Sequence, residues 1–376
     1  MKFKFPLHNL FQRTGGNLAE DVEMPTHPLI YAVIGDDEPT RGDCRAIQGV
    51  ASAVAAKTNG SLRTINFKEM KSVSGADHIT DHKRCLEELM KKDGIPDIVI
   101  GVRNSHDPNR DVIDVISKMD NPGQTLVVTG NSPKLSGHYT GYDELVPHHL
   151  TPENLAREGQ KFSETYGDRI DGDLVAVMLT SHEQDNMIRK IAETARHTGD
   201  RSNPVTLFLC GCKRTSESFL EGFRNIIEQS SSGQDQSSQL NIITYHMSDT
   251  ADNPYIGLLD QADHIVVSGK SSSIVCEGLA TGKSVFTTDD SHECEAGIGM
   301  KKFRSKGFVK SFGGWDSDKG FKTEKIDPIN ATQDVADGII DDFKHMLAGR
   351  DLPGRHYNPD TEKPWRRYVP AEILSL

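Results

Sequence analysis

The sequence has little that suits a membrane-spanning or disulfide-rich secreted protein. None of its apolar runs approaches the ~20 residues that a membrane-spanning helix needs. It has six cysteines in 376 residues, three of them in or beside apolar runs, which favours reduced thiols packed in a core. The first residues, MKFKFPLHNLFQRTGG, lack the sustained apolar core of a secretory signal. We therefore expect a cytoplasmic protein.

The same N-terminal arm leaves a membrane contact open, beside the simpler alternative of a frayed or packed arm. The apolar side chains that would make such a contact are Phe3, Phe5, Leu7, Leu10 and Phe11.

The chain is also poor in positive charge. Its formal net charge is −12 at pH 7, which argues against nucleic acid as the main partner because phosphate backbones require a basic surface. No metal site is indicated either, since the spacing of Cys210, Cys212, His292 and Cys294 matches no standard zinc pattern. Hydrophobic residues make up 35% and charged residues 26%, as in a soluble globular protein.

Short apolar runs alternate with helical patterns along most of the chain. Residues 28–34, 97–101 and 174–179 have the length of buried parallel strands, and each is followed by a polar loop. This alternation predicts an α/β fold with doubly wound parallel sheets. Near the middle, Thr151 and Pro152 carry the signature of a helix start.

The length suggests two domains. We expect an N-terminal arm over residues 1–27, a first Rossmann-like domain over 28–150, a second over 151–330, and a C-terminal helix and tail over 331–376. The end of the tail could pack back across the first domain.

One stretch, residues 253–288, combines the strongest local signals. A brief buried strand over 264–267 is followed by a turn of small residues that includes Gly269. Three serines, Ser271, Ser272 and Ser273, are N-cap candidates, and Gly282 is a natural helix stop. Small residues leave the amides at a helix start uncovered, and these amides and the helix dipole together form an anion site.

Glu277 lies four residues after Ser273, on the same helix face one turn further on. An ionised carboxylate only accepts hydrogen bonds, so it suits the hydroxyls of a ribose and not a phosphate. Phosphate at the helix tip and ribose one turn in would describe a nucleotide diphosphate. The alternative is an ordinary βαβ unit with a well-capped helix and an exposed glutamate.

Polar loops follow other predicted strands. Lys213 and Arg214, at a strand end beside a helix start, could neutralise phosphate, although plain surface charge explains them equally well. In the first domain, Asp43 is a candidate cap for the helix after the first strand. No G-x-G-x-x-G occurs in that loop, so a dinucleotide fingerprint is absent.

Several of these residues resemble a known family. Asn253-Pro254-Tyr255, Ala262-Asp263, Ser271, Ser273, Glu277 and Ala280-Thr281-Gly282-Lys283 are similar to motifs of the mitochondrial-fission ELM1-like family, which itself looks like GT-B glycosyltransferases. Cys212-Lys213-Arg214-Thr215 is similar to its basic threonine loop, and Gly42, Gln48 and Gly49 resemble its glycine loop and first helix. The resemblance implies two facing Rossmann-like domains with an interdomain cleft.

The resemblance further implies a hexosyltransferase-like enzyme that uses a nucleotide-diphosphate sugar as substrate, without a metal or other cofactor. The donor would bind the second domain at Gly269, Ser271, Ser272, Ser273, Glu277, Lys213, Arg214, Thr215, Asn253 and Tyr255. An unknown acceptor would bind the first domain at Asp36, Arg41, Gly42 and Asn104. An inverting transfer needs a base, for which His106 or Asp37 are the candidates.

Whether the chain is an enzyme stays open at this point. One alternative is a catalytically inactive GT-B-fold protein that binds nucleotides or acts by interaction. Another is a nucleotide-sugar epimerase, which would act on the sugar nucleotide without an acceptor.

Overall fold

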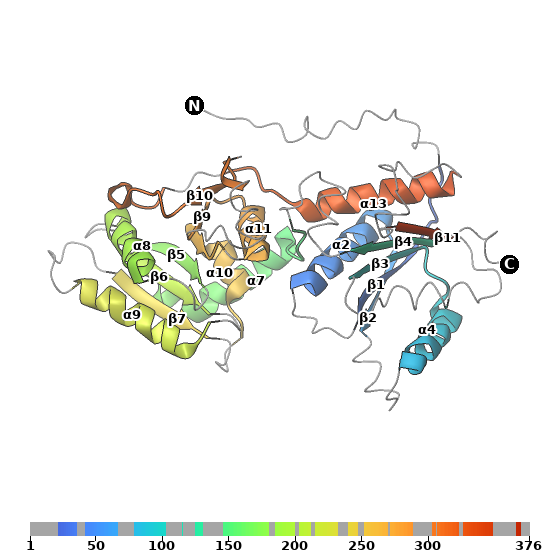
Figure 1. The fold of residues 1–376 in the computed structure, drawn as a ribbon, viewed down its shortest axis with the longest axis horizontal. Helices are drawn as coiled ribbons and strands as arrows, with labels where there is room; N and C mark the ends of the chain where they lie inside the picture. Colours follow the sequence, from blue (N-terminus) through green and yellow to red (C-terminus); the bar gives the residue numbers. More distant parts are fainter. Residues whose placement is uncertain are drawn as a thin grey trace, which may run out of the picture. The chain divides into compact units, whose positions relative to one another are not determined.

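The chain divides into two compact units, each with its own sheet and helices (Figure 1). The computed structural model describes residues 22–35, 42–66, 79–102, 115, 125–130, 146–179, 185–199, 203–211, 215–231, 240–246, 252–269, 271–288, 303–305, 307–322, 326–348 and 366–369. Unit 1 comprises Met1–His149 and Ala331–Leu376, and unit 2 comprises Leu150–Asn330. Among the helices that these ranges contain, none is long and apolar enough to cross a membrane.

The sheet of unit 1 has five described strands in the order β11-β4-β3-β1-β2. They are β1 (Leu29–Gly35), β2 (Ser61–Asn66), β3 (Ile98–Val102), β4 (Thr125–Gly130) and β11 (Arg366–Val369). The first four are parallel, while β11 runs antiparallel to β4 and brings the tail back to unit 1, as predicted. The order 2-1-3-4 of the parallel strands is doubly wound, and the winding changes direction between β1 and β3.

Helices pack on both faces of this sheet. On one face, α2 (Gly42–Thr58) and α13 (Ala331–Leu347) enclose a single apolar core with the strands. On the other face lies α4 (Ile79–Asp93), through Leu86 and Met90. The helix predicted after the first strand is α2, and it begins at Gly42, one residue before the predicted cap Asp43.

The sheet of unit 2 has six described strands in the order β10-β9-β8-β5-β6-β7. They are β5 (Asp173–Met178), β6 (Val205–Cys210), β7 (Leu240–Tyr245), β8 (His264–Val267), β9 (Val285–Thr287) and β10 (Val309–Ser311). Every pair is parallel. Counted within the unit, the order is 3-2-1-4-5-6, which is that of the Rossmann fold. The predicted α/β class with two Rossmann-like sheets is thereby confirmed.

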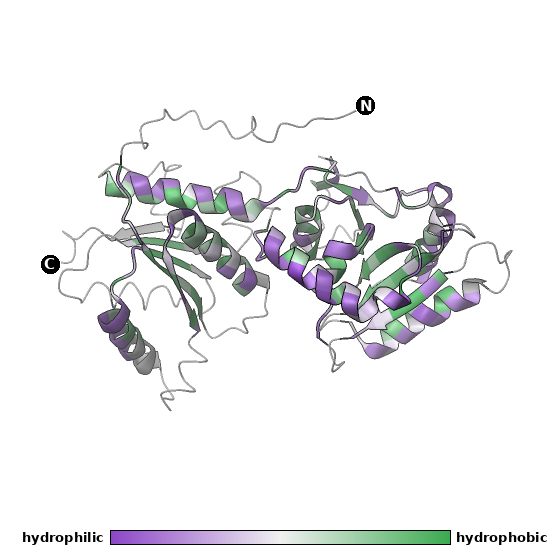
Figure 2. Cartoon of the chain, turned by 180° about the vertical axis from the view of Figure 1, so that it is seen from behind, coloured by the Kyte–Doolittle hydropathy of each residue, from purple (hydrophilic) through white to green (hydrophobic). Residues whose placement is uncertain are grey.

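The longer α-helices of unit 2 each precede one of its strands in the sequence. They are α7 (Pro152–Tyr166), α8 (Asp185–Thr198), α9 (Glu217–Ser231), α10 (Tyr255–Gln261) and α11 (Ser272–Ala280). Figure 2 shows the apolar strands between helices whose outer faces are hydrophilic. The core includes Ile191 and Ala195 from α8, and Phe223 and Ile227 from α9.

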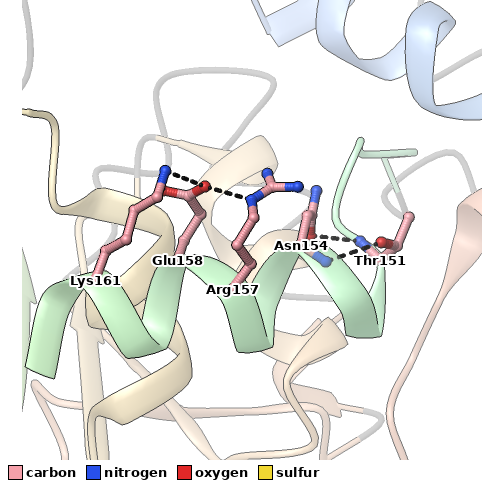
Figure 3. A network of polar contacts seen from close by, with 5 residues as sticks. All are labelled: Thr151, Asn154, Arg157, Glu158 and Lys161. Carbon is pink, nitrogen blue, oxygen red and sulfur yellow. Dashed lines mark hydrogen bonds and ion pairs between the residues drawn. The ribbon is translucent and has the colours of Figure 1, made fainter.

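The start of α7 follows its sequence signature (Figure 3). Thr151 is the N-cap, its side chain accepts the N–H of Asn154, and the Asn154 side chain accepts the N–H of Thr151 in return. Pro152 occupies the first helical position, where its missing N–H costs no hydrogen bond. The predicted helix start is confirmed.

Candidate functional site

The turn that contains Ser268, Gly269 and Ser271, which we call the serine turn, directly follows β8. It lies where the winding of the unit 2 sheet changes direction. β5 and β8 are neighbours, with β6 beyond one and β9 beyond the other. Ligands of open parallel sheets bind outside the carboxyl ends of the strands at this kind of point. The N–H of Ser268, directly after β8, donates to the carbonyl of Met178 at the end of β5 (3.0 Å). The turn therefore begins at the switch point.

Backbone and threonine contacts hold this turn in place. The N–H of Ser271 donates to the carbonyl of Ser268 (3.2 Å), and the N–H of Gly269 donates to Oγ1 of Thr288 (3.3 Å). Thr288 is fully buried and directly follows β9. Sequence reasoning missed Thr288. The available signal was a small polar residue at the end of the neighbouring strand.

The helix that follows begins as predicted, with Ser271 as N-cap and Gly282, at φ +73°, just beyond the C-cap. The Ser271 side chain makes no capping hydrogen bond, although the residue is only 4% exposed. The first intrahelical bond runs from the N–H of Val275 to the carbonyl of Ser271. The N–H groups of the first turn have no acceptor within the helix itself, and such groups can hold an anion.

Glu277 is buried in the second turn of α11, with 6% of its surface exposed. It accepts a hydrogen bond at Oε2 from the hydroxyl of Tyr255, the first residue of α10. The backbone N–H of Tyr255 in turn donates to Oδ1 of Asn253 (3.0 Å). Glu277 is therefore not the exposed glutamate of the ordinary βαβ alternative. Three of the predicted site residues, Asn253, Tyr255 and Glu277, form one chain of contacts.

Thr215 closes the loop that follows β6. Its Oγ1 donates to the carbonyl of Leu179, just past the end of β5 (2.9 Å). Nε2 of His246 lies 2.7 Å from the carbonyl oxygen of Thr215, and Nδ1 of His246 lies 3.6 Å from Glu217. Because its hydroxyl proton is already donated to a carbonyl, Thr215 fixes the loop beside the switch point. His246, after β7, is a second residue that sequence reasoning missed.

Most of the other predicted site residues lie outside the described ranges. They are Lys213 and Arg214 in unit 2, and Asp36, Asp37, Arg41, Asn104 and His106 in unit 1. Of the acceptor-side residues, Gly42 is described as the first residue of α2. Val33 pairs with Gly101, so the loops after β1 and β3 leave from the same edge of the unit 1 sheet. That edge is the switch point of this unit.

Metal ligands do not cluster in the part of the chain that the structure describes. No group of three or more His, Cys, Asp or Glu side chains there could hold a metal ion.

Comparison with solved structures finds similarity to glycosyltransferases. A glycosyltransferase from Rickettsia africae is 13% identical, with a TM-score of 0.40, over 87% of this chain and 90% of that one. MurG from Acinetobacter baumannii is 11% identical, with a TM-score of 0.41, over 83% and 99% of the two chains. Scores this low carry no conclusion about ligand or reaction.

Comparison of sequences identifies the family. Mitochondrial fission protein ELM1 from Arabidopsis thaliana is 34% identical over 89 residues, which make up 23% of this chain and 20% of the plant protein. This chain thus matches only about a fifth of that relative's length. A sequence model of the family "Mitochondrial fission ELM1" matches residues 144–343, which is more than half of the chain. The chain therefore belongs to the mitochondrial fission ELM1 family.

Proposed function

We propose that unit 2 binds the diphosphate of a nucleotide sugar at the serine turn, and that the chain transfers the sugar to an acceptor bound by unit 1. The observation that carries the proposal is the place of this turn. It lies at the switch point of a six-stranded Rossmann sheet, and it leads into a helix whose N-cap side chain makes no capping bond. Both features favour an anionic ligand at the carboxyl edge of β8.

The chemistry needs a stabilised leaving group and a base. In an inverting transfer the acceptor hydroxyl gives its proton to a base, the acceptor oxygen bonds to the sugar carbon, and the sugar–diphosphate bond breaks. The first-turn amides of α11 would meet the developing charge on the diphosphate, aided by Lys213 or Arg214. His106 or Asp37 would serve as the base, and the donor itself would be a substrate, with no metal or further cofactor.

A thermal-shift screen tests the binding step. Nucleoside diphosphates and nucleotide sugars are offered to the full chain, and a ligand present at ~100 times its Kd should stabilise it by about 2.7 kcal/mol. Gly269→Val adds a β-branched side chain to the turn and should abolish the shift. Gly222→Val is the matched control, because a Cβ at Gly222 in α9 meets nothing within 4 Å. If no diphosphate stabilises the wild type, the proposal fails.

The proposal also predicts that binding survives a chelator. Helix amides and basic side chains replace the charge that a cation would supply, so the thermal shift should be the same in EDTA. A shift that disappears in EDTA and returns with magnesium or manganese would contradict this expectation.

Nucleotide binding without transfer is the second candidate. It is favoured by the extent of the family match, since residues 144–343 include all of unit 2 and most of α13 but none of β1 to β4. Chromatography of the nucleotide sugar after incubation with candidate acceptors separates the two functions. Release of free nucleoside diphosphate supports transfer, whereas a nucleotide sugar that stays intact and bound supports a binding protein.

A further inference from the structure

One half-buried arginine of unit 1 lacks an acidic partner. Lys57 pairs with Asp337 (2.5 Å) and Arg63 pairs with Asp93 (2.6 Å). Arg45, near the start of α2, is half-buried too, yet it forms no ion pair within the part of the chain that the structure describes. Partial burial removes water from a cation, and a counter-charge offsets this cost. Arg45 is therefore placed as a residue that takes its counter-charge from a ligand.

Arg45 lies at the switch point of the unit 1 sheet. α2 packs across one face of the sheet (Figure 1). Next to Arg45, Sγ of Cys44 lies 4.0 Å from the carbonyl oxygen of Ile34, at the carboxyl end of β1. The winding of the sheet changes direction between β1 and β3, and ligands of parallel sheets bind at such a place. The start of a 17-residue helix also favours negative charge through its dipole.

His149 is a neighbour of Arg45. Gly49 follows Arg45 by four residues on the same face of α2, and a Cβ at Gly49 would lie 2.8 Å from Cα of His149. Burial and the charge of Arg45 lower the pKa of His149 to about 4. At neutral pH this imidazole is uncharged, so it neither balances nor adds to the charge of Arg45. A bound anion would balance that charge.

We infer that Arg45 binds an anionic group of a ligand in unit 1, either a phosphate or a carboxylate. A guanidinium matches both groups with two parallel hydrogen bonds. The ligand is the acceptor of the sugar, which would make the acceptor an acidic molecule. This assignment rests on the proposed function, in which unit 1 holds the acceptor.

Protection of Arg45 from chemical modification tests the site in the full-length wild type. Phenylglyoxal reacts with accessible guanidinium groups, and mass spectrometry of the digested protein gives the rate at each arginine separately. The ligands are glycerol 3-phosphate and glycerate, with uncharged glycerol as the control, all at equal ionic strength. Comparison of the two anions shows which anionic group the site takes.

At ten times its Kd, an anion that binds should slow the modification of Arg45 about tenfold, whereas glycerol should leave the rate unchanged. Arg63 is the matched control, because Asp93 already supplies its counter-charge, and its rate should stay the same with every ligand. The inference is overturned if neither anion protects Arg45, or if both arginines are protected alike. It is also overturned if Arg45 does not react at all, since the site would then be inaccessible.

The variant Arg45→Gln separates the acceptor from the donor. It should keep the thermal shift caused by nucleoside diphosphates, because we place their binding in unit 2. If the shift is lost in a variant that still unfolds cooperatively, Arg45 holds a phosphate of the donor and the acceptor assignment is wrong. If no diphosphate binds the wild type, the proposed function and the acceptor assignment both fail, while protection of Arg45 by an anion still decides the site itself.

Discussion

At the scale of single residues, we expect His148 and His149, just before the boundary between the units, to make the fold less stable in acid. His148 is 2% exposed. Its backbone N–H donates to Oγ1 of Thr332, and that hydroxyl donates back to the backbone carbonyl of His148. Burial, with His149 adding to it, lowers the pKa of His148 to about 4. Burial and the charge of Arg45 lower the pKa of His149 to about 4 as well.

The consequence for stability has a definite sign. A histidine whose folded pKa lies below its unfolded value stabilises the fold fully above pH ~6.5 and loses that contribution as the pH falls toward 4. For His148 we expect a loss of about 2 kcal/mol between pH 7.5 and pH 5. Hydrogen exchange of the amides in β1 and β3, corrected for intrinsic rates, measures this difference.

His148→Gln should reduce the difference between the two pH values, whatever its effect at either one. His197→Gln, whose side chain on α8 is 44% exposed, should leave the difference unchanged. An undiminished pH dependence in His148→Gln would show that this histidine does not protonate on unfolding.

At the scale of elements, α7 tests how much the capping bonds at a helix start contribute to the free energy of unfolding. Thr151→Ala removes the side-chain acceptor for the Asn154 N–H (Figure 3) and should cost about 1 kcal/mol. Thr165→Ala is the control, since its hydroxyl donates back to the carbonyl of Lys161 in the same helix, a bond that adds little to helix stability. Urea unfolding of unit 2 gives both values. Equal losses of unfolding free energy in the two variants would show that the capping bond stabilises the fold no more than the hydroxyl of Thr165 does.

The elements also show what sequence can and cannot predict. β8 has the predicted bounds because it is a brief run with the length of a buried strand. β10 was missed because its three residues, with a lysine in the middle, carry no such pattern. The turn at Gly269 was predicted from its small residues. Its contacts with Met178 and Thr288 were not, because they join segments that are remote in sequence. The partner of Glu277 was missed for the same reason.

At the scale of the whole molecule, unit 1 depends on a helix that lies beyond unit 2 in the sequence. α13 contributes Val335, Ile339 and Phe343, all fully buried, to the core around α2. A chain cut after residue 330 should therefore lose the cooperative unfolding of unit 1, since removing several core side chains costs more than a typical domain's stability. Unit 2 keeps its own core and should unfold as before.

Trp315 reports on unit 2 in this experiment, because its ring packs against Phe286, 5.0 Å between centroids. The other tryptophan, Trp365, is lost with the cut. A chain cut after residue 348 keeps α13 and loses β11, so it should retain the transition of unit 1. If the cut after residue 330 also abolishes the fluorescence transition of Trp315, the two units are not independent.

The split composition of unit 1 sets an order of events on the ribosome. Domains usually fold from the N-terminus onward as the chain is made. Here the 181 residues of Leu150–Asn330 must be translated before α13 emerges, which takes roughly 10 to 40 seconds at ~5–20 residues per second. Throughout that interval the apolar face of α2 lacks its partner helix, α13. The second unit can complete its core first, and the nascent first unit is the part of the chain for which chaperones would compete.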